Sequence, residues 1–260
     1  MLICSFLAAA EPRFGVVEGE SVFELAGSLF DANHKRGQLV GSLTSVKLLP
    51  PVSPSKIMCI GRNYAAHAKE RGEDVPSEPL LFLKPPSALI GNGQAIEIPH
   101  NAGRVEHEAE LAVVIGKQGR FIRQQDALAH VLGYTCANDV SARDYQARDR
   151  QWTRAKGFDT FCPLGPWIAT GLDTSSISIH CTVNGERKQD GNTSQLIFGI
   201  PHLIAHISAI MTLYPGDIIL TGTPAGVSPI KAGDILEVEI EGIGKLQNPV
   251  VGADRKTQAE

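Results

Sequence analysis

"RVEHEAELAVVIGK" (residues 104–117) places three glutamates at alternate positions immediately before an apolar run that predicts a buried strand. In a strand, side chains at positions i and i+2 share a face and lie roughly 6.5–7 Å apart along it. Glu108 and Glu110 can therefore lean toward one point while Leu111 and Val113 face the core. If that point is even partly buried, repulsion and desolvation would protonate one carboxylate unless a cation is present. A strand whose outer face is simply solvated remains the alternative, because carboxylate ligands carry no tight spacing rule.

A third carboxylate strengthens the metal interpretation. In "GYTCANDVSARDYQ" (133–146), Asp139 follows a short apolar and β-branched stretch, and Asn138 and Ser141 mark a change of direction. Loops that follow strands are common positions for functional sites. Glu108, Glu110 and Asp139 would together suit Mg²⁺ or Mn²⁺, which prefer oxygen ligands, better than zinc. A turn or capping aspartate is the competing interpretation of Asp139.

A candidate general base lies upstream, in "GRNYAAHAKE" (61–70). If residues 64–70 are helical, His67 and Glu70 lie three positions apart on one face. The carboxylate is then close enough to orient the imidazole and raise its basicity. The same pair would be ordinary solvent-facing decoration if no site lay beside it.

Two loops offer further polar groups. "RAKGFDTFCPLGP" (154–166) sets Lys156 before a glycine, among prolines and aromatic residues. "ILTGTPAGV" (219–227) ends a strand in a Gly/Pro loop, where the hydroxyls of Thr221 and Thr223 and nearby backbone N–H groups could hold a carboxylate or an oxyanion. Taken singly, a surface lysine and ordinary turn chemistry explain both loops.

Composition limits the class of protein. The 260 residues are 43% hydrophobic with a formal net charge of -4, which predicts one sizeable core and no basic face for nucleic acid or anionic lipid. No stretch approaches the roughly 18–20 apolar residues that a membrane helix needs. The five cysteines lack CxxC spacing, which favours a reducing, cytoplasmic location. The expected partners are small molecules or copies of the same chain.

Turn-bounded apolar runs predict strands through most of the chain. The "VNGE" segment (183–186) is the strongest hairpin signal. Helical patterns are weaker, at 63–72, 123–133 and 200–216. The predicted strands after the first fifty residues are 56–61, 79–85, 110–116, 165–170, 176–185, 216–223 and 233–244.

The chain is expected to divide near a proline-rich segment. Residues 1–25 alternate apolar and polar positions as short hairpins do. "VKLLPPVSPSK" (46–56) is the best candidate linker. We therefore expect a small N-terminal β-rich unit at 1–52 and a catalytic domain at 53–260.

Together these segments resemble the fumarylacetoacetate hydrolase family, over about residues 56–252. The resemblance implies a mostly β (α+β) fold, a mixed β-sandwich roll with few short helices. It also implies a homodimer and a divalent metal, Mg²⁺ or Mn²⁺, in each active site. The matching stretches, in the family's order, are "GRNYAAHAKE", "PLLFLKP", "EHEAELAVVIGK", "GYTCANDVSARDYQ", "AKGFDTFCPLGP" and "GDIILTGTPAGV".

The resemblance also implies roles for individual residues. The family's metal ligands fall on Glu108, Glu110 and Asp139, and Glu106 is not among them. The catalytic His/Glu dyad falls on His67 and Glu70, in a segment that is a mobile lid in relatives. The positions that contact substrate fall on Arg143, Gln146, Lys156 and Thr223, and we count Lys156 among the catalytic residues because it would support negative charge on the substrate.

The resulting hypothesis is a metal-dependent enzyme that acts on a 2-oxo acid through a metal-stabilised enolate. The first expectation is hydrolysis of a C–C bond in an acylpyruvate or fumarylpyruvate-like β-diketo acid. The close alternatives are 2-hydroxyhepta-2,4-diene-1,7-dioate isomerisation and oxaloacetate-type decarboxylation, in aromatic catabolism. A non-catalytic metal- or ligand-binding protein on the same scaffold is the hypothesis from another class.

Overall fold

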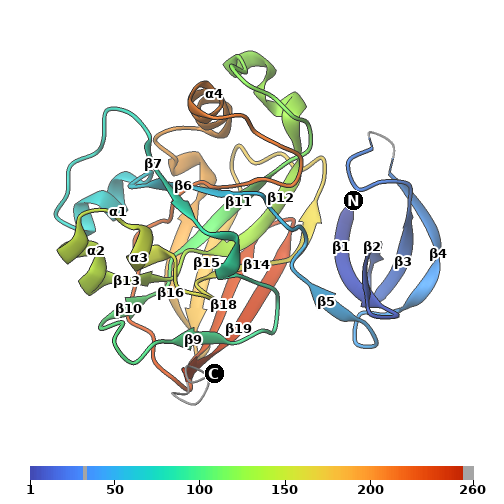
Figure 1. The fold of residues 1–260 in the computed structure, drawn as a ribbon, viewed down its shortest axis with the longest axis horizontal. Helices are drawn as coiled ribbons and strands as arrows, with labels where there is room; N and C mark the ends of the chain where they lie inside the picture. Colours follow the sequence, from blue (N-terminus) through green and yellow to red (C-terminus); the bar gives the residue numbers. More distant parts are fainter. Residues whose placement is uncertain (32–33, 254–260) are drawn as a thin grey trace.

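The computed structural model describes residues 1–31 and 34–253, and they form a mostly β fold, as predicted. Most strands belong to one mixed sheet of 12 strands. In Figure 1 the N-terminal strands stand to one side of a larger body that holds the remaining elements. The sheet runs in the order β4 (Lys35–Ser42), β3 (Ser21–Ala26), β2 (Glu11–Glu18), β1 (Leu2–Ala8), β14 (Cys162–Ala169), β12 (Val131–Asn138), β11 (Ala109–Ile115), β17 (Ile218–Leu220), β6 (Ile57–Gly61) and β7 (Leu80–Lys84), with β5 (Lys47–Leu49) beside β1 and β8 (Leu89–Ile90) beside β14.

Two smaller sheets complete the body. Neighbouring strands are antiparallel except for β17 with β6, β14 with β8 and β19 with β9. The described residues contain no helix long and apolar enough to cross a membrane. The second sheet has the order β16 (Glu186–Asn192), β15 (Ser178–Val183), β18 (Ile235–Ile240), β19 (Gly244–Gly252) and β9 (Ile96–Ile98), and the third pairs β10 (Val105–Glu106) with β13 (Ser141–Ala142).

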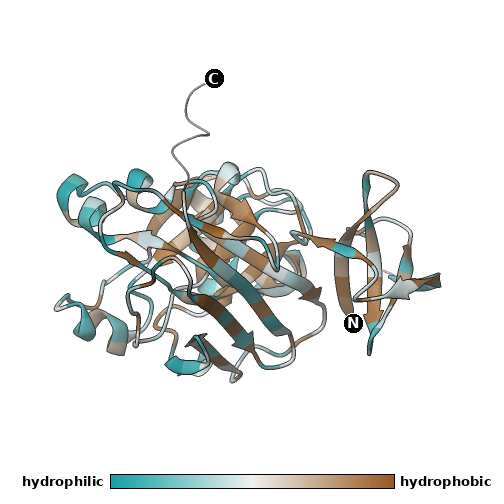
Figure 2. Ribbon diagram, turned by 90° about the horizontal axis from the view of Figure 1, so that it is seen from below, coloured by the Kyte–Doolittle hydropathy of each residue, from teal (hydrophilic) through white to brown (hydrophobic). Residues whose placement is uncertain are grey.

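Strand β11 lies in the middle of the large sheet and is buried at every position. Its residues alternate between two cores: Leu111 and Val113 pack with the second sheet and α4 (Ile200–Ile210), whereas Ala112 and Val114 pack on the opposite face. A strand covered on both faces needs a continuous apolar run rather than an alternating one, which is what its sequence supplies. Figure 2 shows the consequence, with hydrophobic colour concentrated in the strands and hydrophilic colour on the short helices at the edge.

The predicted hairpin at "VNGE" is present between β15 and β16. Asn184 and Gly185 both have positive φ, 52° and 80°. That is the requirement of the two-residue turn which Asn-Gly favours. The segment 46–56 includes β5, which pairs with β1.

The three predicted helices are shorter than their patterns suggested, and the structure adds helices that the sequence did not indicate. Helix α1 (Ala65–Glu70) lies inside the predicted 63–72, and α2 (Arg143–Asp149) and α3 (Thr153–Lys156) were not predicted. In 123–133 the helix is a 3₁₀ segment, η2 (Gln124–His130), and the chain then enters β12, where the β-branched Val131 pairs with β11. In 200–216 the helix ends at Ile210, because Met211 is already extended at φ -143°. Two further 3₁₀ segments are η1 (Pro86–Ala88) and η3 (Thr193–Gln195).

Candidate active site

The start of β11 and the end of β12 lie side by side and bring three carboxylates together. The antiparallel register pairs Ala109 with Asn138, so Glu108 and Asp139 stand next to each other just outside the ladder. The Asp139 amide donates to the Glu108 carbonyl at 2.8 Å, and the Glu108 amide donates to Asn138 Oδ1 at 2.9 Å. Ligand oxygens of Glu108, Glu110 and Asp139 all lie within 4.8 Å of one another. The side-chain cluster predicted from sequence is therefore present as one group.

Burial excludes the solvated-face alternative for this strand. Glu108, Glu110 and Asp139 expose only 5%, 2% and 0% of their surface. Carboxylates at this depth must be paired, protonated or bound to a cation, since an isolated buried charge is strongly unfavourable.

Buried cations neutralise two of the three carboxylates. Lys156 Nζ lies 2.7 Å from Glu108 Oε2 and 2.6 Å from Asp139 Oδ2. Lys84 Nζ contacts the other Asp139 oxygen at 2.6 Å, and Arg143 Nη2 contacts Glu108 Oε1 at 2.5 Å. Within the described ranges, Glu110 has no basic side chain at ion-pair distance, and it accepts a hydrogen bond from the Gly222 amide at 2.5 Å.

The protonation equilibria follow this asymmetry. Burial works to raise the pKa of Glu108, but Arg143 and Lys156 outweigh it and hold that pKa well below its usual value. For Glu110, burial and then the negative charges of Asp139 and Glu108 raise the pKa well above its usual value. Glu110 is thus the carboxylate with the greatest need of a further cation.

The donor set fits a divalent metal. Three buried carboxylates from strand ends supply hard oxygen ligands, and Glu110 lacks a countercharge that such an ion would provide. Mg²⁺ and Mn²⁺ prefer these ligands, whereas zinc sites usually include histidine or cysteine.

Helix α1 places the predicted dyad over this cluster. His67 Nδ1 lies 3.4 Å from Glu70 Oε2, and its Nε2 lies 3.9 Å from Glu108 Oε1. Burial lowers the pKa of His67, and Arg143 adds to that effect against the opposing charges of Glu108 and Glu70. The imidazole is therefore held neutral near pH 7, the form that accepts a proton.

Glu70 also fastens α1 to the strand-end loop after β17. Its two carboxylate oxygens accept from the Gly226 amide at 3.1 and 3.2 Å. Gly226 has φ +99°, and a Cβ there would lie 2.0 Å from the Lys188 carbonyl. The loop can approach Glu70 in this way because residue 226 is glycine.

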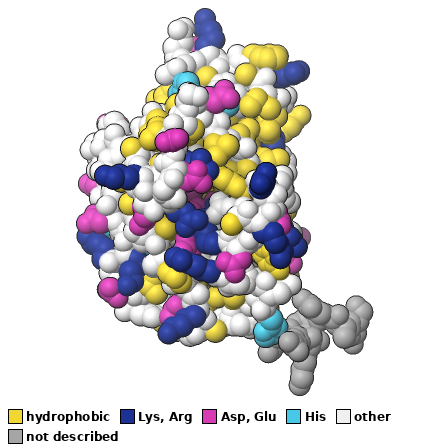
Figure 3. Space-filling model, turned by 90° about the vertical axis from the view of Figure 1, so that its left-hand side faces the viewer, with side chains coloured by type: hydrophobic (Ala, Val, Ile, Leu, Met, Phe, Trp, Pro, Cys, Tyr) yellow, Lys and Arg dark blue, Asp and Glu magenta, His cyan; other side chains and the backbone are white. Residues whose placement is uncertain are grey.

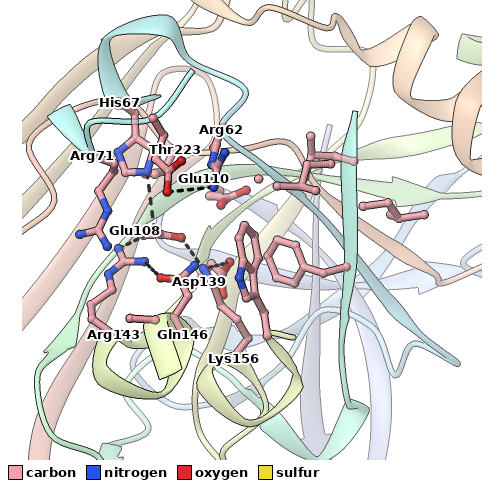
Figure 4. Close-up of a pocket in the computed structure, with 18 of the residues that line it drawn as sticks. Arg62, His67, Arg71, Glu108, Glu110, Asp139, Arg143, Gln146, Lys156 and Thr223 are labelled. Carbon is pink, nitrogen blue, oxygen red and sulfur yellow. Dashed lines mark hydrogen bonds and ion pairs between the residues drawn. The ribbon is translucent and has the colours of Figure 1, made fainter. Parts of the chain in front are cut away.

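A pocket of about 610 Å³ opens over the cluster. Eight of the nine residues predicted to form the site line it. The ninth, Glu70, does not line the pocket but contacts His67, which does. Figure 4 shows His67 on one side of the acidic cluster and Arg143, Gln146 and Lys156 on the other. The eight are His67, Glu108, Glu110, Asp139, Arg143, Gln146, Lys156 and Thr223.

Thr223 differs from the expectation in one respect. Its hydroxyl donates to the Ala109 carbonyl at 2.7 Å and accepts from Gln189 Nε2 at 2.7 Å. Gln189 Oε1 in turn accepts from the Ala109 amide at 2.9 Å. The hydroxyl proton therefore serves to join this loop to β11, and it is not directed at a ligand in the pocket.

Sequence reasoning missed several charged residues. Lys84 was included in a predicted strand without a role, although a lysine within an apolar strand is a visible signal. Glu106 was set aside as outside the metal site, yet it is fully buried and binds Arg143 Nε at 2.5 Å. The pocket is also lined by four charged residues that no sequence pattern singled out: Arg62, Arg71, Glu73 and Arg150. In Figure 3 dark-blue Lys and Arg side chains gather near the middle of the pocket-bearing face, with carboxylates among them.

A buried carboxylate cluster under a histidine, carried at the strand ends of a mixed β fold, is an arrangement that could hold a metal ion. The chain belongs to the fumarylacetoacetate hydrolase family: residues 56–251 match the family model described as Fumarylacetoacetate (FAA) hydrolase C-terminal. Residues 1–51 match a second model, described as Rv2993c-like, N-terminal.

Relatives with described activities include a tautomerase, an isomerase and a hydrolase. A mitochondrial oxaloacetate tautomerase of Xenopus laevis is 45% identical over 246 residues, covering 90% of this chain and 76% of that protein. The crystal structure of a 2-hydroxyhepta-2,4-diene-1,7-dioate isomerase from Mycobacterium marinum superimposes with a TM-score of 0.90 at 42% identity, covering 98% of this chain and 100% of that one. A maleylpyruvate hydrolase from Sphingobium sp. SYK-6, solved with manganese(II) and pyruvate, gives 0.82 and 32%, with coverage of 98% and 100%.

Proposed function

We propose that this protein is a divalent-metal-dependent tautomerase or isomerase. It would transfer a proton between the carbon next to the carbonyl of a 2-oxo acid and either the carbonyl oxygen or another carbon. The observation that carries the proposal is the position of His67, a buried imidazole whose Nε2 lies 3.9 Å from Glu108 Oε1. Because His67 lies beside Glu108, a proposed metal ligand, it would also lie close to a substrate that binds at the metal.

Glu108, Glu110 and Asp139 would hold Mg²⁺ or Mn²⁺. The ion, when bound, would supply Lewis-acid stabilisation of negative charge on the substrate's 2-oxo oxygen. The chain itself contributes binding groups: Arg143 and Gln146 face the pocket from α2, and their mutual hydrogen bond of 2.9 Å fixes their orientation. Lys156, a cation beside two of the carboxylates, supports the substrate's carboxylate and the charge that forms during reaction.

His67 is the proposed proton carrier. Its Nε2 accepts the proton of the C–H bond beside the carbonyl, and the electron pair of that bond forms the enolate. The same nitrogen then returns the proton either to oxygen or to another carbon, which yields the enol or a shifted double bond. Glu70 accepts the Nδ1–H and stabilises the imidazolium that exists between the two transfers.

This order differs from the one that the sequence alone suggested, in which C–C hydrolysis came first. Hydrolysis requires the base to activate a water toward a distal carbonyl, whereas His67 contacts the metal-ligand end of the pocket. The relatives with described activities at 42–45% identity are a tautomerase and an isomerase, while the maleylpyruvate hydrolase is 32% identical. The position of His67 and the activities of these relatives both support proton transfer as the primary activity.

Hydrolysis of an acylpyruvate-like β-diketo acid is retained as the second candidate. The His67–Glu70 pair is the arrangement that would deprotonate a water, and a hydrolase relative of this fold was solved with pyruvate. Decarboxylation of oxaloacetate would use the same charge stabilisation and needs no base. A homodimer, a cytoplasmic location and a place in aromatic catabolism are also proposed from the family.

The test is turnover with four substrates in Mg²⁺ or Mn²⁺ and then in EDTA, for wild type and His67→Ala: enol-oxaloacetate, a 2-hydroxydienedioate, acetylpyruvate and fumarylpyruvate. We expect metal-dependent ketonisation or isomerisation of the first two, reduced about 10²–10⁴-fold by His67→Ala. Faster cleavage of the diketones would make the hydrolase the correct assignment. Loss of carbon dioxide that is insensitive to His67→Ala would identify a decarboxylase. No turnover with bound metal would favour a binding protein on this scaffold.

A further inference from the structure

Arg62 stands at the outer wall of the pocket in an unusual backbone conformation. It directly follows β6 and has φ 56°, in the left-handed region that is unfavourable for residues with a Cβ. Such a conformation costs of order 1–2 kcal/mol for an ordinary residue. The turn at the end of β6 could be made more easily by glycine, so the arginine side chain is the feature that this position adds to the pocket.

The only acidic partner of Arg62 within the described chain is Glu73, at 3.1 Å between Nη2 and Oε1. The side chains of Arg62 and Glu73 are 29% and 48% exposed, and Glu73 comes from the segment after α1. A half-exposed ion pair of this kind contributes little, about 0–1 kcal/mol, so another anion can replace the glutamate at small cost.

The cations deeper in the pocket are held more firmly. Lys156 and Arg143 contact the acidic cluster at 2.5–2.7 Å and are almost completely buried. Arg71 is tied to the buried Glu106 at 3.5 Å, and Arg150 is exposed without an ion-pair partner among the described residues. Arg62 alone combines partial burial, which strengthens its electrostatic interactions, with a partner that is easily displaced.

The charge balance of the pocket agrees with a substrate that carries two negative groups. Five basic side chains and four carboxylates line it, a net charge of plus one. A divalent ion at the acidic cluster would raise this to plus three. A 2-oxo acid with a single carboxylate would leave most of that charge uncompensated, and the excess would lie toward the arginines of the outer wall.

We infer that Arg62 is a specificity-determining residue that binds the second carboxylate of a 2-oxo dicarboxylic acid, and that Glu73 occupies Arg62 until the substrate displaces it. The inference rests on the proposed function, because the 2-oxo acid end is placed at the metal site. It adds Arg62 as the residue that recognises the substrate's second carboxylate, and Glu73 as the carboxylate of the protein that competes with the substrate for Arg62.

The test compares binding of 2-oxoglutarate and 2-oxopentanoate, which have the same chain and differ by a terminal carboxylate or methyl group. Isothermal titration calorimetry of the full chain loaded with Mn²⁺ measures binding without turnover. We expect wild type to bind 2-oxoglutarate about 10- to 100-fold more tightly, the usual range for a charge-assisted contact. In Arg62→Asn, whose new residue tolerates the left-handed backbone, this preference is expected to vanish, with affinity for 2-oxopentanoate changed by less than about threefold.

Three companion variants sharpen the test. Arg62→Lys should restore part of the preference, and Glu73→Gln should strengthen 2-oxoglutarate binding about two- to fivefold by removing the competing carboxylate. Arg150→Asn is the matched control, since residue 150 also lines the pocket and has φ 61°. The inference is overturned if wild type shows no preference, if Arg150→Asn removes it, or if Arg62→Asn weakens both ligands equally. Because calorimetry needs no catalysis, absent turnover would count against the proposed function without touching this result.

Discussion

The floor and the outer wall of the pocket are built on different physical principles. The floor, formed by Glu108, Glu110 and Asp139, is carried on the central strands. Buried cations within 2.7 Å compensate Glu108 and Asp139, and Glu110 accepts a hydrogen bond from the Gly222 amide. The wall, formed by residues 62–73, is a strand end and one short helix. Its start is anchored by the fully buried Asn63, which hydrogen-bonds to Phe198 and Thr221. Its later residues are held by Glu70 and by a long ion pair from Arg71, and Arg62 pairs with Glu73 inside the wall. A rigid floor can hold a metal in fixed geometry, whereas the half-exposed ion pairs of the wall can exchange partners when a ligand enters.

The largest expected effect comes from the floor. Glu110→Gln removes a proposed metal ligand, so metal-dependent activity should fall by at least about 10³-fold. Calorimetric titration with Mn²⁺ measures the loss of metal affinity, and the turnover assay described above measures the loss of activity. Full activity in the variant would show that Glu110 is not a metal ligand.

The same substitution should stabilise the metal-free protein. The pKa of Glu110 is raised in the folded state by burial and by Asp139 and Glu108, so folding opposes its ionisation. The resulting loss of stability is absent below the unfolded-state pKa of about 4.3 and grows as pH rises above it. We expect the free energy of unfolding at pH 8 to be about 1–3 kcal/mol higher in Glu110→Gln than in wild type. Thermal melts in EDTA at pH 5 and pH 8 measure it, and Mn²⁺ should reverse the order by stabilising wild type alone.

His67 joins the wall to the floor and gives the next effect. His67→Ala should lower kcat by about 10²–10⁴-fold while leaving Mn²⁺ affinity within a few-fold, because the histidine is not a ligand. Equal losses of metal and activity would place His67 in the metal site and contradict the division between base and ligands.

The pH profile tests the environment of that histidine. Because burial lowers the pKa of His67, the base stays neutral and activity persists below the ordinary histidine pKa of about 6.5. The acid limb of kcat/KM should therefore lie under that value. Glu70→Gln removes a group that raises this pKa, so the limb should move further down and kcat should drop about tenfold. An acid limb above pH 7 would contradict the assigned environment.

The two regions also differed in how well the sequence predicted them. The carboxylate cluster was predictable because strand periodicity and the apolar run at 110–116 fix which residues share a face. The family's motifs brought in the residues from α2 and α3, whose helices the sequence did not indicate. The ion pairs were not predictable, since Lys84 reaches Asp139 across 55 residues and Arg62 reaches Glu73 only through the path of α1. Contacts of that kind depend on tertiary packing, which local patterns do not contain.

The smallest expected effect concerns Glu106. This carboxylate gives a direct comparison, because it binds an arginine next to the floor and another from the wall. Glu106 is fully buried and contacts Arg143, which also binds the floor, at 2.5 Å, with 5% of the arginine exposed. It contacts Arg71 from the wall at 3.5 Å, with 34% exposed, and the exposed Arg104 pairs with its other oxygen. Removing Arg143 takes a buried countercharge from both Glu106 and Glu108, and breaking a buried pair costs about 3–5 kcal/mol. A long, half-exposed pair contributes about 0–1 kcal/mol.

Arg71→Gln should therefore change the free energy of unfolding by less than about 1 kcal/mol and raise KM only a few-fold, while its control, Arg143→Gln, destabilises by about 3 kcal/mol or more. Urea titrations of both variants, compared at equal slope, measure the difference. If Arg71→Gln proves as costly as Arg143→Gln, the segment after α1 is anchored as firmly as the floor, and access to the pocket must then depend on another part of the chain.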